Sequence, residues 1–581
     1  MHTNKKRKCA RGWVALLCGL AASAALAASG TVFVAPGTNT TAAIKGALEQ
    51  LRAAGGGTLK LAPGDYHLFA AEAERVVLRV SNHDQPANHP VALPLMGISN
   101  LTLEGNGARL LLHGEAMVGL IKDATNVFIR NLSVDWARPP FTELVYQGPT
   151  PDGKGGVFSC DRALYPFTVE NGMFHARGDG LDIPQRIGMA FRADTHEIVP
   201  GSADIWCNRA TLREDGTIVY DSNFGAIGAG MRPGDVLVLR SFARPHPGFC
   251  LHRAKDVVFE DVVVHAAFGM AFLAQVSENV SIVGSQTAAD KTCGVFPSAG
   301  RVGAHTVDAT HFSNVKGQVC VKNAWFEGMM DDAINVHSTC LVIQGISADR
   351  RRIRCRYMHE GAYGFGVFQP GDDMRLIRAK TLENGPVLRI EAVDTPNERE
   401  VELALAGPLP DAFGTGDAVE NATWQCAVEF RGNVVTHNRA RGALFTTPKP
   451  VRVEDNRFLN ISGSAILFAG DAMNWYESGG CEDVVIRGNY FRDCVTSYFQ
   501  YCEGVVSIFP EIKDVAHQKK RYHRNILIED NVFDTFDTTL LFASSAENVT
   551  WRDNTVRKNT HYPPSGRASF RVENSEKVDV K

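Results

Sequence analysis

The segment VEFRGN at residues 428–433 returns as VRVEDN at residues 451–456, 23 positions later. The same offset of 23 separates ILIEDN at 526–531 from VTWRDN at 549–554, and VVFED at 257–261 from VSIVG at 280–284. Short alternating strands, with turn residues at a fixed phase, are typical of stacked coils. We therefore expect a right-handed parallel β-helix whose Asn side chains hydrogen-bond between coils. A β-propeller, with a period of roughly 40 residues, does not fit these spacings.

A helix is expected ahead of the first coils, where it can cover the open end of the stack. Thr41 is placed to cap this helix, and Ile44, Ala47, Leu48 and Leu51 recur at helical spacing on one face. The expected fold class is therefore all-β, a parallel β-helix with an N-terminal capping helix.

Two insertions interrupt the repeat. Asn131 to Asp261 spans 130 residues and Asn323 to Asn433 spans 110, which exceeds one coil by about 107 and about 87 residues. Both insertions carry a Pro-Gly-Asp turn before an apolar strand, and we expect them to form one small β-barrel together. The expected organisation is a signal peptide at 1–27, N-terminal coils at 28–138, an insertion at 139–245, catalytic coils at 246–338, a second insertion at 339–425 and C-terminal coils at 426–581.

The first 27 residues have the pattern of a secretory signal. Five basic residues precede the apolar run from Trp13 to Leu26, and Ala25-Leu26-Ala27 closes it. Cleavage after Ala27 and export to the periplasm or the medium are expected. Lipid anchoring at Cys18 is a poorer alternative, because Leu17 rather than a small residue precedes that cysteine.

Charge and composition exclude several classes of partner. Without the leader, the 60 Lys and Arg become 55 against 64 Asp and Glu, a net charge of −9 that argues against nucleic acid. No later apolar stretch approaches the ~20 residues of a membrane span. The scattered cysteines form no C-x-x-C pair, which argues against zinc, and they fix no disulfide pairing. The sequence leaves the oligomeric state open, including a homo-oligomer.

The densest cluster of acids is TVDATHF at residues 306–312, followed by GMMDDAINVH at residues 328–337. Asp308 and Asp331 are 23 residues apart, one coil of the repeat, so Asp308, Asp331 and Asp332 should lie on one wall. Like charges this close raise the pKa of at least one carboxyl. A proton donor beside ionised carboxylates is the arrangement that glycoside hydrolysis needs.

Other interpretations of these acids stay open. An Asp in a β-helix turn often bonds only its local backbone, and clustered acids can also hold Ca²⁺. A polysaccharide lyase on this scaffold would need Lys or Arg as its base, and these segments offer only Lys316. A non-catalytic glycan-binding β-helix is a third alternative.

The acids resemble those of two families. DDAINVH at 331–337 looks like the paired aspartates of polygalacturonases, whose third Asp also lies about one coil earlier. A closer resemblance is to glycoside hydrolase family 110, the α-1,3-galactosidases, in DATHFSNVKG at 308–317, GMMDDAINVH at 328–337 and AGDAMNWYESG at 469–479. This resemblance implies exo-acting, inverting release of terminal α-1,3-galactose from blood-group-B-type or linear glycans, without a metal or cofactor.

Roles follow from the same resemblance. It implies Asp308, Asp331 and Asp332 as the catalytic group, and the polygalacturonase parallel assigns Asp331 as general acid and the other two as holders of the attacking water. An aromatic face beside a carboxylate suits galactose, although Trp475 could instead cover the core and the histidines could be structural. The expected substrate-binding residues are His311, Asn335, His337, Asp471, Trp475 and Glu477.

Overall fold

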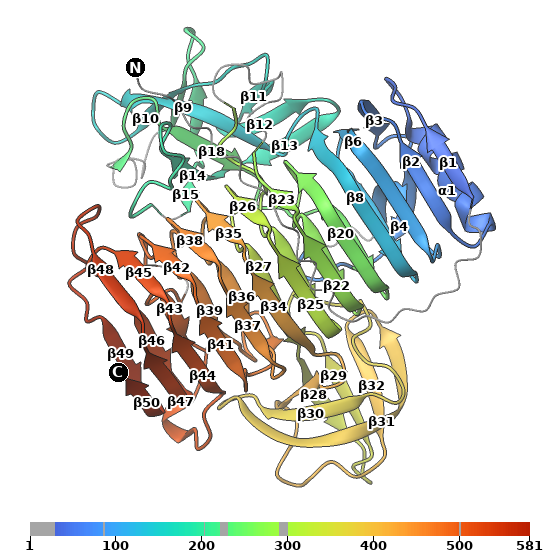
Figure 1. The fold of residues 1–581 in the computed structure, drawn as a ribbon, viewed down its shortest axis with the longest axis vertical. Coiled ribbons are helices and arrows are strands. Elements are labelled where there is room, and N and C mark those ends of the chain that lie inside the picture. Colours follow the sequence, from blue (N-terminus) through green and yellow to red (C-terminus); the bar gives the residue numbers. More distant parts are fainter. Residues whose placement is uncertain (1–29, 85–87, 203, 221–229, 290–299, 499–500) are drawn as a thin grey trace, which may run out of the picture.

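The computed structural model describes residues 30–84, 88–202, 204–220, 230–289, 300–498 and 501–581. The expected signal peptide at 1–27, with Cys18, lies outside these residues. The regular secondary structure of the described residues is almost entirely β-strand, with an α-helix, α1 (Thr41–Ala53), near the N-terminal end. Its strands stack as successive coils along one axis (Figure 1). The predicted parallel β-helix is confirmed.

Residues that lie 23 positions apart in the repeat pair with each other on neighbouring strands of one parallel sheet. Its strands pair Val257 with Val280, and Val428 with Val451, as the repeat predicts. The members used below are β8 (Thr125–Trp136), β20 (Lys255–Val264), β22 (Glu278–Val283), β25 (Lys316–Lys322), β34 (Cys426–Arg431), β37 (Val451–Glu454), β41 (Val484–Arg487), β44 (His523–Glu529) and β47 (Ala546–Arg552). A second parallel sheet contains β19 (Phe249–His252), β21 (Phe272–Gln275), β24 (Thr310–Ser313), β27 (Ile334–Thr339), β36 (Ala443–Phe445) and β39 (Ile466–Phe468).

A ladder of asparagines ties the C-terminal coils together. Each Asn donates from Nδ2 to Oδ1 of the next, at 2.9–3.0 Å, and all but the last are 0–1% exposed. Every side chain in the ladder also donates to a backbone carbonyl, so these buried amides are satisfied. The predicted stacking of Asn side chains is confirmed for Asn433, Asn456, Asn489, Asn531 and Asn554.

The two insertions form separate units, so the prediction that they build one barrel is wrong. The second insertion alone closes a six-stranded barrel from β28 (Leu341–Ile346), β29 (Arg352–Arg356), β30 (Asp373–Arg378), β31 (Glu383–Asn397), β32 (Glu400–Leu405) and β33 (Ala418–Asn421). The buried apolar side chains of this barrel pack in a cluster of their own, which contains no residue of the first insertion. The first insertion instead forms a seven-stranded antiparallel sheet that includes β9 (Phe141–Pro149), β15 (Ile205–Trp206) and β18 (Val236–Arg240), at the opposite side of the β-helix (Figure 1).

The coils before and after each insertion are direct neighbours in the stack. Strand β8 pairs directly with β20, and β25 pairs directly with β34, so the intervening residues loop out between neighbouring coils. The second insertion therefore leaves the β-helix directly after β27, whereas the first leaves it between β8 and β19, two coils before the one that carries β24.

Helix α1 packs its predicted apolar face inward, with Ile44, Ala47, Leu48 and Leu51 buried. Thr41 is not its cap, contrary to expectation. Thr41 is the first helical residue, and its hydroxyl accepts a hydrogen bond from the Phe69 backbone at 3.0 Å.

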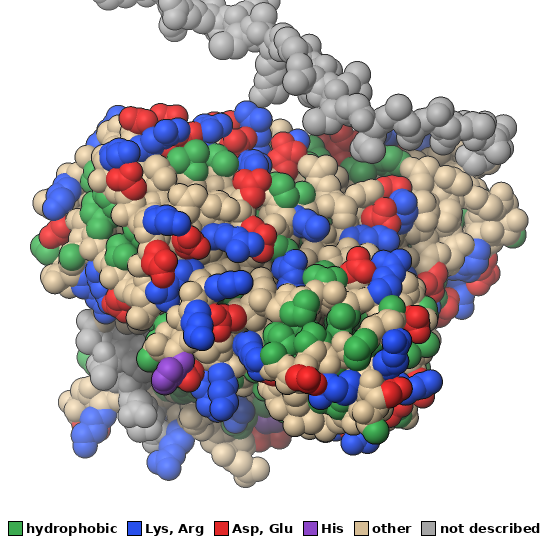
Figure 2. All heavy atoms as spheres, turned by 90° about the horizontal axis from the view of Figure 1, so that it is seen from below, with side chains coloured by type: hydrophobic (Ala, Val, Ile, Leu, Met, Phe, Trp, Pro, Cys, Tyr) green, Lys and Arg blue, Asp and Glu red, His purple; other side chains and the backbone are tan. Residues whose placement is uncertain are grey.

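Within the described residues, we find no helix with the length and apolarity needed to cross a membrane. On the face shown in Figure 2, Lys and Arg side chains are interspersed with Asp and Glu. This face presents no continuous basic track of the kind that binds a phosphate backbone.

Candidate active site

In three successive coils, the loop before the strand of the second sheet carries a charged residue at the same position. Strands β24, β27 and β36 are neighbours whose first residues pair in register. Two residues ahead of these strands lie Asp308, Asp332 and Arg441. The coil from β24 to β27 is 24 residues long, so Asp332, and not Asp331 as expected, is the counterpart of Asp308. Asp331 is the additional residue, and its side chain is the most exposed of the three acids, at 14%.

The three aspartates meet as predicted from the repeat. One carboxylate oxygen from each of Asp308, Asp331 and Asp332 lies within 4.8 Å of the others. This separation is shorter than the ~6.5–9.5 Å usual between the carboxyls of an inverting glycosidase. Two oxygens at this separation can share a single water through hydrogen bonds of ~2.8 Å.

Two arginines, which the sequence analysis did not single out, hold the carboxylates. Arg441 donates to Asp332 from its backbone N–H at 3.0 Å and from Nη2 at 2.8 Å. Arg439 contacts Asp331 at 3.3 Å and makes two 2.8 Å hydrogen bonds to Asp204 of the first insertion. The position of Arg441 could have been found from coil equivalence, but the second insertion hides the 109-residue offset from Asp332.

The surroundings of the three aspartates shift their pKa values in different directions. Burial raises the pKa of Asp331, but Arg439 and Arg441 outweigh burial and leave that pKa below its usual range. Burial, together with the Asp331 charge, raises the pKa of Asp308 well above its usual range. Burial also raises the pKa of Asp332, against the attraction of Arg441. Asp331 is therefore the one acid of the three whose pKa is lowered, which does not match its expected role as proton donor.

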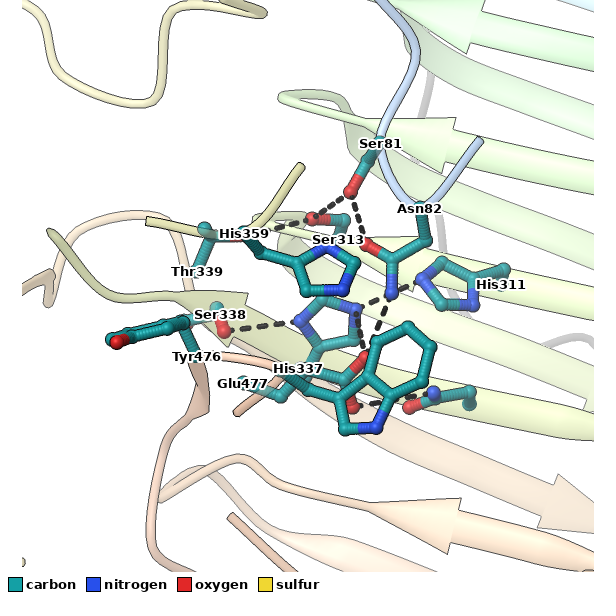
Figure 3. Close-up of polar contacts among 12 residues, drawn as sticks. Ser81, Asn82, His311, Ser313, His337, Ser338, Thr339, His359, Tyr476 and Glu477 are labelled. Atoms are coloured by element: carbon teal, nitrogen blue, oxygen red, sulfur yellow. Dashed lines mark hydrogen bonds and ion pairs between the residues drawn. The ribbon is translucent and has the colours of Figure 1, made fainter. Parts of the chain in front are cut away.

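A chain of short contacts leads away from Asp308 into the protein. Asp308 Oδ2 lies 2.8 Å from His311 Nδ1, and His311 Nε2 lies 2.8 Å from His337 Nε2. His337 Nδ1 contacts the Ser338 carbonyl at 3.0 Å, and Glu477 lies 3.5 Å from His337 Nε2. Figure 3 shows these histidines and Glu477 pointing toward one another. Burial and the neighbouring imidazole lower the pKa of His311 to about 3, so His311 is neutral.

Within the described residues, two groups of side chains lie close enough together to hold a metal ion. One is His311, His337 and Glu477, and the other is the triad of aspartates. The two facing nitrogens of His311 and His337 are 2.8 Å apart. Nitrogens bound to one Zn²⁺ at ~2.0–2.1 Å in a tetrahedral site stand farther apart, at roughly 3.3 Å. The separation fits a hydrogen bond between the rings, and we treat the pair as hydrogen-bonded.

Asp471 organises the loop that follows it. Its carboxylate accepts hydrogen bonds from four backbone N–H groups, those of Met473, Asn474, Trp475 and Tyr476, at 2.7–3.1 Å. Although Asp471 lines the cavity, its oxygens are committed to shaping this loop rather than free for a ligand.

The loop places Trp475 and Glu477 on the cavity wall, as expected. Trp475 is 39% exposed and stacks on His359 of the barrel insertion at 4.7 Å, and Arg244 lies 5.7 Å from its ring. Glu477, in β40 (Glu477–Ser478), accepts hydrogen bonds from Asn82 at 2.8 Å and Asn335 at 3.4 Å.

These residues line a cavity of about 650 Å³, the size of a small-ligand site. His311 and Asn335 lie on its wall as expected, whereas His337 is buried behind it. Chain segments far apart in sequence close the cavity, including both insertions. The lining residues outside the predicted set include Asn82, His83, Asp204, Arg240, Arg244, His359, Tyr363, Arg439, Arg441 and Glu511. Contributions from the insertions carry no repeat signal, so the sequence analysis missed them.

Several known proteins resemble this chain over most of its length. Residues 352–419 match the family described as GLAA-B beta-barrel domain II. An α-1,3-galactosidase B from Akkermansia muciniphila is 41% identical over 93% of this chain and 67% of its own length. The chain belongs to the α-1,3-galactosidases of glycoside hydrolase family 110. Another member, α-1,3-galactosidase B from Phocaeicola vulgatus, is 36% identical over 90% of this chain and 88% of its own.

Among solved structures, a mannuronan C-5 epimerase module from Azotobacter vinelandii covers 94% of this chain and 96% of its own, with a TM-score of 0.38 and 13% identity.

Proposed function

We propose that this family member is an exo-acting, inverting α-1,3-galactosidase that releases terminal galactose from blood-group-B-type or linear α-Gal glycans. Membership of the family supports the linkage. The observation that carries the proposal is the triad of Asp308, Asp331 and Asp332 in the wall of one cavity. Both insertions and the 471–477 loop wall the cavity, which suits one chain end better than the middle of a polymer.

The charge of the cavity favours a neutral sugar. Nine carboxylate residues and four arginines line it, and none of the described lining residues is a lysine. A uronic acid would meet this excess of negative charge. The alternatives of a polysaccharide lyase or a polygalacturonase-like hydrolase, both acting on acidic polymers, are therefore less well supported.

The electrostatics suggest a division of roles that reverses the one taken from the polygalacturonase parallel. Asp308, whose pKa burial raises, suits the general acid that protonates the leaving oxygen. Asp331, whose pKa the arginines lower against burial, suits the base that takes a proton from water. Asp332, fixed by two hydrogen bonds from Arg441, suits the second holder of that water. The short spacing of the acids allows two of them to share it.

The test is the release of free galactose by purified protein. We expect release from branched fucosylated and linear α-1,3-galactosides, and none from α-1,4- or α-1,6-galactosides. Unsaturated, ultraviolet-absorbing products from an acidic polysaccharide would instead support a lyase. Sugar binding without turnover, retained in Asp331→Asn, would support a non-catalytic glycan-binding protein.

A further inference from the structure

A second cavity lies on the outer face of the first parallel sheet, next to the first insertion. Its volume is about 370 Å³, and none of its described lining residues lines the catalytic cavity. The strands beneath it are β26 (Trp325–Glu327), β35 (Val434–Thr436), β38 (Arg457–Leu459) and β42 (Tyr490–Arg492), which follow one another in the sheet (Figure 1). Glu197 of the first insertion also lines this cavity, which we call the outer groove.

The outer groove contains an exposed indole whose position is fixed. Trp325 is 40% exposed, and its Nε1–H donates to the Glu327 carboxylate at 2.9 Å. Glu327 itself is buried. Because the indole N–H is already bonded, Trp325 offers a ligand the face of its ring. An aromatic face of this kind packs against the C–H face of a sugar ring.

Two arginines, Arg457 and Arg492, line the outer groove beyond Trp325. Trp325 pairs in register with Val434, and Val434 pairs with Arg457. Two strand spacings therefore separate Trp325 from Arg457, ~9.6 Å at the backbone. Arg492 extends from β42, the strand that follows β38 in the sheet. A short chain of sugar rings that packs on Trp325 therefore reaches a guanidinium.

Neither arginine donates a side-chain hydrogen bond to an acid of the described residues. Arg457 lies over the Tyr490 ring at 5.3 Å and forms no ion pair within the described part of the chain. Arg492 is half exposed and lies 3.6 Å from Asp493, which already contacts His561 at 2.7 Å. Guanidinium groups in this state favour a carboxylate or a sulfate, which they bind through charge-assisted hydrogen bonds.

The acids that line the outer groove already accept hydrogen bonds within the protein. Glu327 accepts from the indole of Trp325, and Glu197 accepts from the Tyr562 hydroxyl at 3.1 Å. Beside Glu327, at 3.8 Å, the buried Nδ1 of His437 makes no hydrogen bond to the described residues. In the catalytic cavity, by contrast, nine carboxylate residues outnumber four arginines. The outer groove therefore suits an anionic ligand better than the catalytic cavity does.

We propose that the outer groove is a second glycan-binding site, which takes a saccharide that carries a carboxylate or a sulfate ester. The sugar ring packs on Trp325, and the anionic group binds Arg457 and Arg492. The site is separate from the proposed galactosidase activity, which acts on neutral chain ends in the catalytic cavity. Binding of acidic glycans in the outer groove raises the local concentration of neutral chain ends on the same glycans.

Calorimetric titration of the purified protein with sialyllactose, sulfated lactose and unmodified lactose tests the site. None of these probes has a terminal α-galactose, so turnover does not interfere. We expect the acidic saccharides to bind at least about tenfold more tightly than lactose, because lactose lacks the charge-assisted hydrogen bonds. Binding of both acidic probes supports a site for either group, and binding of one identifies the group as a carboxylate or as a sulfate. Equal affinity for lactose would overturn the proposal.

Variants place the binding in the outer groove. Trp325→Ala should weaken the affinity for the acidic saccharide by up to about tenfold, and Arg457→Gln should weaken it by at least about tenfold. Trp206→Ala removes a similarly exposed indole of the first insertion, at 46%, and should bind as the wild type does. Both groove variants should keep the wild-type kcat/KM for galactose release, which also shows that they fold.

Three results would contradict the site. One is a wild type that binds neither acidic saccharide, and another is unchanged affinity in both groove variants. The third is displacement of the acidic saccharide by galactose, because the ligand would then occupy the catalytic cavity. Failure of the proposed function is distinct, since it appears as a wild type that releases no galactose and leaves these titrations unaffected.

Discussion

Replacing Arg439 by Met tests the assignment of Asp331 as the base. Arg439 Nη1 lies 3.3 Å from the Asp331 carboxylate, and the Arg439 side chain is 5% exposed. Two unit charges ~4 Å apart interact by about 4 kcal/mol at an effective dielectric constant near 20. One pKa unit corresponds to ~1.36 kcal/mol, so the upper limit of the change is about three units. Arg441 remains nearby, and we expect the pKa of Asp331 to rise by about one to two units.

The sign of the resulting change separates the two roles. An ionised base is active above its pKa, and its activity is lost as pH falls through that pKa. If Asp331 is the base, Arg439→Met moves the acid limb of kcat/KM to higher pH. If Asp331 is the general acid, the alkaline limb moves to higher pH instead. Arg439→Lys keeps the charge and should leave the acid limb close to that of the wild type. An alkaline shift in Arg439→Met, with the acid limb unmoved, refutes the reasoning.

Three other outcomes are expected. Asp308→Asn should lower kcat on natural glycans by about 10²–10⁴-fold, and an aryl galactoside with a good leaving group should recover most of the loss; equal losses on both substrates would exclude Asp308 as the acid. Asn489→Ala removes the middle of the asparagine ladder and should lower the free energy of unfolding by about 3 kcal/mol in urea titrations, with kcat at 25 °C unchanged; an unchanged unfolding midpoint would contradict the energetic role of the ladder. Trp475→Ala should raise KM by up to about tenfold, because an aromatic contact contributes ~0.5–1.5 kcal/mol; an unchanged KM would leave Trp475 as a cover for the core.

The repeat makes the β-helix and the acid cluster predictable from sequence. A strand period with Asn at constant phase fixes which residues stack, so the period alone places Asp308 next to the Asp331-Asp332 pair. The finer register was missed, because one extra residue in that coil aligns Asp332 rather than Asp331 with Asp308. Local turn length, which decides this shift, leaves no periodic signal.

The charged partners of the acids were not predictable in the same way. Asp204 and Arg244 lie in the first insertion, just before β15 and a few residues after β18, and the packing of this insertion against the coils depends on long-range contacts. Arg439 and Arg441 lie on the coil after the triad, but about 87 residues of insertion separate them in sequence from the pattern that would have aligned them. Without these arginines, the sequence could not show that the pKa of Asp331 is lowered. The roles proposed from the structure therefore differ from those expected from the sequence.

Early-time proton NMR of the reaction with a linear α-1,3-galactobioside is the most direct measurement of the central claim. It reports the bond broken, the sugar released and its anomeric form in one spectrum. We predict that free β-galactose appears first, before mutarotation, together with the shortened acceptor. α-Galactose as the first product would contradict inversion and would make one of the three aspartates a nucleophile. A spectrum that shows no free galactose would contradict the proposed activity itself.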